Sequence, residues 1–236
     1  MDRLVGVEEL LDGPLDDTAA LVGNLRDLAR INRLTGGAAL SARAIDDLVA
    51  AAAGASGGET LLDVGTGAAD IPALVLAAAR ERGRGLAVTA SDSRQEVLDA
   101  ALLARPSLAG VPGLTFAVAD GRGLPWPDGS FDVAHASMVI HHLSSDDAVA
   151  FLRELRRVAR IGVVINDLVR GRLFWLGGWL LVHAIATSRF TRHDGPLSVR
   201  RAYTRAEFAN LVAAAGLTTI STRVAFAGHR VAIAAR

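Results

Sequence analysis

The sequence predicts a doubly wound α/β fold with a mostly parallel sheet, on three observations. Short apolar strands alternate with helical segments between residues 59 and 167. The apolar runs do not alternate with polar residues, as is expected of strands that are buried on both faces. The last two apolar runs, 217–228 and 229–236, meet at Ala227-Gly228, which predicts an antiparallel hairpin at the end of the sheet.

The elements are expected in a regular order. Residues 15–53 should form two helices, and the first carries an apolar stripe through Leu21, Leu25, Leu28 and Ile31. The expected strands and helices then alternate as strand 59–64, helix 71–82, strand 86–91, helix 95–104, strand 114–119, strand 131–136, helix 146–159, strand 161–167 and helix 204–215. Ser144 and Thr204, each with an acid three residues later, have the spacing of helix N-caps.

This order divides the chain into four regions. Residues 1–57 form N-terminal helices that act as a lid, 58–167 the ligand-binding core, 168–200 a helical cap insertion, and 201–236 a helix and hairpin that complete the sheet. The apolar stretch 173–186 is too short to span a bilayer, which needs about 20 residues. We therefore expect it to cover a substrate, with an interfacial helix or a dimer contact as alternatives.

Composition excludes several classes of function. The chain has 25 basic and 25 acidic residues, so there is no bulk positive charge to attract nucleic acid. It contains no cysteine, which excludes disulfides and thiolate chemistry and suits a reducing compartment. The acidic N-terminal segment does not resemble a signal peptide. We expect a cytoplasmic protein that acts on a small molecule, without stable membrane insertion or a catalytic metal. A homodimer is left open as its oligomeric state.

Residues 61–72, LLDVGTGAADIP, are the most informative segment. A strand ends at Asp63, a glycine turn follows at Gly65-Thr66-Gly67, and a helix opens at the edge of the sheet where ligands bind. A dinucleotide-binding turn would carry a third glycine where this sequence has Asp70, and an acid there disfavours a pyrophosphate. A nicotinamide-dependent oxidoreductase is therefore disfavoured, and a ligand with an amine or a positive charge is favoured.

This segment resembles the glycine-rich motif of class I S-adenosylmethionine-dependent methyltransferases, in the branch similar to quinone-biosynthesis enzymes. The segments TASDSRQEVLDAA (89–101) and FAVADGRGLPWPDGSFDVAHASMVIHHL (116–143) resemble further motifs of that family in the same order. The segments NDLVRGRLFWLGGWLL and TRHDGPLSVRRAYT resemble small-molecule methyltransferases of aromatic polyketide pathways. One departure is Ala69, near which the family usually has a glycine.

The resemblance implies a Rossmann-like methyltransferase fold, S-adenosylmethionine as the cofactor and a set of binding residues. Asp92 would hold the ribose hydroxyls, Asp120 the adenine amino group, and Ser137 and Met138 would lie beside the methionine part. The implied cofactor residues are Asp63, Gly65, Thr66, Gly67, Asp70, Asp92, Ser93, Asp120, Gly121, Ser137 and Met138. Purely structural roles remain open, because Asp63 and Asp120 also suit turns and Asp92 suits a helix cap.

Two histidines are candidates for a general base, which a weakly acidic hydroxyl acceptor needs. His141 follows the fourth strand at the ligand edge, although the His141-His142 pair also suits the start of a helix. His193 lies in the polar stretch 188–203 with Asp194 beside it, although Gly195-Pro196 suits a surface turn. His135, inside a strand, is expected in the core.

The expected acceptor is a small apolar or aromatic molecule. Asn166 ends the fifth strand and is expected to face the acceptor, together with Trp175, Trp179 and His193 from the insertion. The aromatic content of that insertion favours a phenolic or polyketide-like acceptor and O-methylation. C-methylation of a quinone-like ring, or a protein of this fold that binds the cofactor without transferring methyl, are the alternatives.

Overall fold

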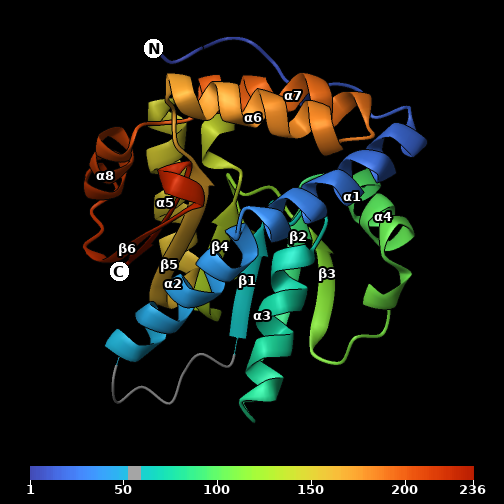
Figure 1. The fold of residues 1–236 in the computed structure, drawn as a ribbon. Helices are drawn as coiled ribbons and strands as arrows, with labels where there is room; N and C mark the ends of the chain where they lie inside the picture. The colour runs from blue at the N-terminus through green and yellow to red at the C-terminus, as the bar shows by residue number, and fades with distance from the viewer. Residues whose placement is uncertain (53–59) are drawn as a thin grey trace.

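The computed structural model, which describes residues 1–52 and 60–236, is built on one seven-stranded sheet in the order β3-β2-β1-β4-β5-β7-β6 (Figure 1). Strands β1 to β5 run parallel, and β7 lies antiparallel between β5 and β6. The strands are β1 (Thr60–Val64), β2 (Ala87–Asp92), β3 (Leu114–Val118), β4 (Phe131–Ser137), β5 (Ala159–Leu168), β6 (Thr219–Ala225) and β7 (Arg230–Ala235). The predicted doubly wound fold and terminal hairpin are confirmed.

Helices cover both faces of this sheet. The helices are α1 (Thr18–Leu34), α2 (Gly37–Ala51), α3 (Asp70–Glu81), α4 (Gln95–Ala104), α5 (Ser145–Val158), α6 (Arg172–Ile185), α7 (Arg189–Arg201) and α8 (Arg205–Ala214), with short 3-10 turns η1 (Leu10–Asp12), η2 (Pro106–Leu108), η3 (Ile140–His142) and η4 (Phe226–Gly228). One apolar core packs α5 and α8 against β4, β5 and β7, and a second packs α2 and α3 against the opposite face. These two cores hold the strand ends rigidly in place.

Most predicted elements are confirmed within a few residues. Ser144 accepts a hydrogen bond from the Asp147 backbone at the start of α5, and Thr204 and Glu207 form the predicted capping box of α8. Helix α2 begins at Gly37, earlier than expected, because Gly36 adopts a left-handed conformation that lets the chain turn at once. The expected helix end at Ala53, the linker 54–58 and residue 59 lie outside the described residues.

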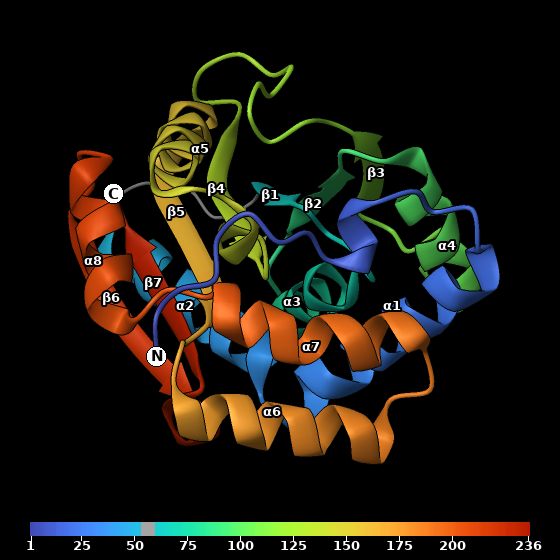
Figure 2. The ribbon, with the colours of Figure 1, turned by 90° about the horizontal axis from the view of Figure 1, so that it is seen from above.

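Helices α1, α6 and α7 lie together above the carboxyl ends of the parallel strands (Figures 1 and 2). The polar stretch 188–203 is chiefly the helix α7, which continues through Gly195 and Pro196 where a turn had been an alternative. Asp27 of α1 holds the segment between α6 and α7, because it accepts hydrogen bonds from the backbones of Thr187 and Ser188, each at 2.8 Å. Among the described residues, no helix combines the length and apolarity that crossing a membrane requires.

Candidate functional site

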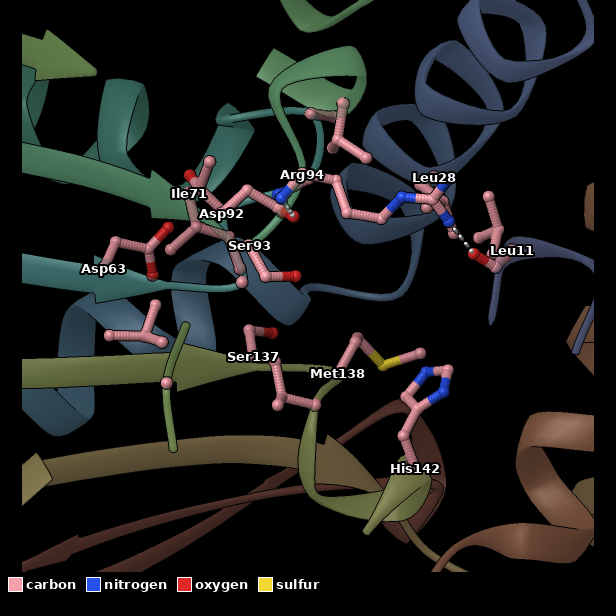
Figure 3. Close-up of a pocket in the computed structure, with 18 of the residues that line it drawn as sticks. Leu11, Leu28, Asp63, Ile71, Asp92, Ser93, Arg94, Ser137, Met138 and His142 are labelled. Carbon is pink, nitrogen blue, oxygen red and sulfur yellow. Dashed lines mark hydrogen bonds between the residues drawn. The ribbon is translucent and has the colours of Figure 1, made fainter. Parts of the chain in front are cut away.

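A cavity of about 580 Å³ opens at the carboxyl ends of β1, β2 and β4, beneath α1. Its size falls in the range of small-molecule sites, roughly 300–1,000 Å³. Every residue that the sequence assigned to cofactor binding lines this cavity, and Figure 3 shows part of that lining. The side chains of Leu21, Leu25 and Leu28 on α1 close it from above, in agreement with the predicted apolar stripe.

The glycine turn after β1 brings the backbone close to the cavity. Gly65 and Gly67 have φ angles of 69° and 50°, in the left-handed region that side chains rarely adopt. A Cβ at Gly65 would lie 2.6 Å from Cγ2 of Val139, so the turn has no room for a larger residue. Ala69 also has a positive φ, 49°, at the N-cap of α3. This left-handed conformation favours glycine, and this chain adopts it with alanine.

Two carboxylates at the ends of β1 and β2 lie close to this turn. Asp92 accepts hydrogen bonds from the backbones of Gly67 (3.2 Å) and Arg94 (3.3 Å). Burial raises the pKa of Asp92, although these hydrogen bonds favour its charged form. Asp63 lies 2.5 Å from Nδ1 of the buried His135, which confirms His135 as a core residue. The cavity therefore contains hydrogen-bond acceptors on fixed strand ends.

The other two acids of the predicted set differ from each other. The Asp120 side chain is half exposed and pairs with Arg122 at 2.7 Å, which lowers its pKa. Asp70 is more enclosed and accepts from Asn32 of α1 at 3.1 Å, and burial raises its pKa. Asp70 thus ties the start of α3 to the helix that covers the cavity, while Asp120 lies at the cavity's open side.

A second, smaller cavity of about 120 Å³ continues from the first beneath α6 and α7. The two share the lining residues Leu11, Leu28, Asn32, Met138 and His142. Met138 has a φ of 61°, a strained conformation that only the surrounding contacts can maintain. In Figure 3 its side chain lies between Ser137 and His142. Met138 therefore marks the junction between the two cavities.

His141 is brought to the second cavity and is held by a buried carboxylate. Its Nδ1 lies 2.7 Å from Oδ1 of Asp167, and its backbone N–H donates to the other oxygen at 3.1 Å. Burial opposes ionisation of Asp167, but the charge and hydrogen bonds of His141 outweigh it, and the pKa of Asp167 is lowered. Nε2 of His141 lies on the side of Glu9, 3.7 Å from its carboxylate. An oriented imidazole of this kind is suited to accept a proton.

The structure does not bring the remaining predicted acceptor residues to either cavity. Asn166 is fully buried and donates to Gly37 O and Ser41 Oγ, both at 2.8 Å, under α2. His193 is half exposed, and its partner Asp194 also accepts hydrogen bonds from the N-terminal segment. Trp175 packs on the core beside Leu168, and Trp179 stacks on His183 at the surface. The two tryptophan rings therefore lie outside the linings of both cavities, and an aromatic acceptor site formed by them stays a prediction.

Three residues without a sequence signal belong to the second cavity. Glu9 comes from the N-terminal segment and lies beside His141 and His142. His229 is 6% exposed and both of its ring nitrogens lack a hydrogen-bond partner, while burial and the neighbouring Arg230 lower its pKa to about 4. The buried Arg230 donates to Asn32 at 2.6 Å. Only the folded chain brings these distant positions together.

Residues 62–165 match the family model described as a methyltransferase domain. One curated relative is the ubiquinone/menaquinone biosynthesis C-methyltransferase UbiE of Rickettsia akari (strain Hartford). It is 35% identical over 100 residues, which are 42% of this chain and 40% of that protein. The chain thus matches less than half the length of that curated relative.

Solved structures with the same fold extend over more of the chain. A SAM-dependent methyltransferase from Aquifex aeolicus has a TM-score of 0.60 and 21% identity, and the match covers 91% of this chain and 97% of that one. The [4+2]-cyclase SpnF has a TM-score of 0.54 and 22% identity, and the match covers 80% of this chain and 61% of that one. At these identities the likeness concerns the fold.

Proposed function

Because residues 62–165 match a model of a methyltransferase domain, we propose that this chain transfers a methyl group from S-adenosylmethionine to a hydroxyl of a small, largely apolar acceptor. The observation that carries the proposal is the continuity of the two cavities. The larger contains the whole predicted cofactor set, and the smaller contains an oriented histidine beyond Met138.

The residues of the larger cavity fit the cofactor. Thr66 Oγ1 is buried without a partner at the cavity wall, and the Gly65 position leaves no space for a Cβ. Asp92 is an acceptor for the ribose hydroxyls, and Asp63 for the amine. S-adenosylmethionine would supply an electrophilic methyl group on a sulfonium. It carries no phosphate, so its site needs no phosphate-binding groups. The acid at Asp70, where a pyrophosphate would lie, is compatible with such a ligand.

The chain's task in the reaction is to position the acceptor and remove its proton. The acceptor oxygen bonds to the methyl carbon as the carbon–sulfur bond breaks, and the sulfur keeps that electron pair. We assign the hydroxyl proton to Nε2 of His141, since Asp167 fixes Nδ1 as the protonated nitrogen and stabilises the imidazolium that results. The lining of Leu28, Leu181 and Val182 favours an aliphatic or aromatic carbon skeleton next to that hydroxyl.

The test is methyl transfer to paired phenolic and non-phenolic acceptors, with the products identified by mass spectrometry and NMR. His141→Gln should lower turnover by roughly 10²–10⁴-fold, the usual contribution of a general base, while its affinity for S-adenosylmethionine stays the same. His183→Gln, at an exposed histidine of α6, is the matched control. Full O-methylation by His141→Gln would overturn the assignment of the base.

C-methylation is the second candidate, since the curated relative is named a C-methyltransferase. A protein that binds S-adenosylmethionine without transferring its methyl group is the third candidate, because a protein named as a [4+2]-cyclase shares the fold. A carbon-methylated product would establish the former. Binding of S-adenosylmethionine with no S-adenosylhomocysteine formed from any acceptor would favour the latter.

A further inference from the structure

Glu9, His141 and His142 direct their side chains at one point between the two cavities. Glu9 Oε1 lies 3.7 Å from His141 Nε2, and Glu9 Oε2 lies 3.8 Å from His142 Nε2. One ligand atom from each residue lies within 4.8 Å of the others. Glu9 and His141 are buried, and His142 is partly buried. The three come from the N-terminal segment and from η3, more than a hundred positions apart in the sequence.

Each histidine has a separate carboxylate beside its other ring nitrogen. Nδ1 of His141 is hydrogen-bonded with Asp167 at 2.7 Å, whereas Nδ1 of His142 lies 2.9 Å from Asp12 without the geometry of a hydrogen bond. The Asp167 contact favours the proton on Nδ1 of His141 and leaves its Nε2 lone pair toward Glu9. The Nε2–carboxylate distances are too long for hydrogen bonds. Three electron-rich atoms therefore surround a small space that a cation would stabilise.

We propose that Glu9, His141 and His142 form a binding site for a divalent transition metal of the zinc class. Two imidazole nitrogens and one carboxylate are a common ligand set for that ion, and a carboxylate behind each histidine is the usual arrangement around it. Tetrahedral bonds of about 2.0–2.2 Å place ligand atoms about 3.4 Å apart. The observed spacing of up to 4.8 Å must therefore contract when the side chains close on the ion.

The charges around the site also favour a cation. Glu9, Asp12 and Asp167 are acidic, and Asp194 lies nearby on the wall of the same cavity. Basic residues are also present: Arg201 lies 2.7 Å from Asp12 and 3.5 Å from Glu9, and Arg230 lines the same cavity. Ser198 donates to Glu9 at 3.0 Å and so holds the carboxylate in place. The fourth coordination position faces the second cavity, because Glu9, His141 and His142 all line it.

A consequence for catalysis rests on the proposed function. A bound metal and the transferred proton would both use the Nε2 lone pair of His141. Saturation with Zn²⁺ should therefore inhibit O-methylation, and a chelator should restore it. The binding of the metal itself does not depend on methyl transfer. Absence of metal binding would therefore leave the proposed methyl transfer standing, and absence of methyl transfer would leave the proposed metal site standing.

The test uses the full chain without a histidine tag, stripped with a chelator and titrated with Co²⁺ and Zn²⁺. We expect one metal per chain, with the intense visible absorption of tetrahedral Co²⁺ that Zn²⁺ abolishes. Glu9→Gln and His142→Asn should remove this signal. Asp12→Asn keeps all three ligands and should weaken affinity by about 10–100-fold. His183→Asn, at a surface histidine, should bind as the unchanged chain does.

Far-UV circular dichroism and urea denaturation of the same variants report whether each one is folded, independently of any ligand. The proposal is overturned if the unchanged chain shows no saturable binding at one metal per chain. It is equally overturned if folded Glu9→Gln, His142→Asn and Asp12→Asn all bind Co²⁺ as tightly as His183→Asn does.

Discussion

Replacing Asp92 with asparagine should separate ligand binding from stability. The carboxylate accepts from the backbones of Gly67 and Arg94 and lies in the cavity wall, where burial raises its pKa. In the proposed complex it also accepts from the ribose hydroxyls. A hydrogen bond to a charged group contributes about 1.5–3 kcal/mol, which corresponds to a roughly 10–150-fold loss of affinity for S-adenosylmethionine.

The free energy of unfolding should change much less. Asparagine removes a carboxylate that burial disfavours, but its amide N–H₂ cannot accept the backbone hydrogen bond that one oxygen receives. These effects oppose each other, and a net change within about 1 kcal/mol is expected.

Isothermal titration calorimetry and urea denaturation measure the two quantities on the same preparation. Asp99→Asn, at an exposed acid of α4 bonded to Gln95, is the matched control and should change neither. The reasoning is refuted if Asp92→Asn binds S-adenosylmethionine as tightly as the unchanged chain. It is also refuted if affinity and stability fall in parallel, since the carboxylate would then act only on the fold.

Three further predictions concern the glycine turn, the second cavity and the proposed base. Gly65→Ala should lower the free energy of unfolding by about 2 kcal/mol or more, because a positive φ and the clash with Val139 add together. Gly83 has a similar φ with open space around it, so Gly83→Ala is the control. If urea denaturation showed the same loss of stability for both variants, the clash with Val139 would not contribute. His229 has a pKa of about 4 in the folded chain against about 6.5 when unfolded. Its stabilising contribution is therefore complete above pH 6.5 and is lost as the pH falls toward 4, by roughly 3 kcal/mol in total. Urea denaturation of the unchanged chain and His229→Gln should show a stability difference that shifts by that amount across the window, and a constant difference would contradict the lowered pKa. Asp167→Asn should lower the turnover of a hydroxyl acceptor at least about tenfold and alter its pH profile, because the imidazolium of His141 would lose its carboxylate. A kinetic assay that found an unchanged rate and pH profile would remove Asp167 from the proposed mechanism.

The fold and the larger cavity were predictable because their signals are local. A glycine turn after a buried strand, and acids at the ends of the next strands, place Asp63, Asp92 and Asp120 at one edge of a parallel sheet. The parallel sheet follows from the alternation of strands and helices, and the final hairpin follows from two apolar runs about a glycine. Helix ends were predictable where Ser144 and Thr204 supply a capping side chain.

The acceptor site was less predictable because its residues meet only through long-range packing. Aromatic residues in the insertion suggested a substrate cover, yet Trp175 packs on the core and Trp179 lies at the surface. Asn166 lies at the end of the expected strand, but its side chain points beneath α2, since successive strand residues face opposite sides. Nothing near Glu9 in the sequence indicates that it faces His141. Periodicity describes the face of an element, and it does not identify the partner across a cavity.

The most direct test of the account is calorimetric titration of the unchanged chain with S-adenosylmethionine and with S-adenosylhomocysteine. The account predicts saturable binding of both at one ligand per chain, weakened by Asp92→Asn and unaffected by Asp99→Asn. Absence of binding for both ligands would contradict it, because the larger cavity would then hold a different ligand and the proposed methyl transfer would lose its donor.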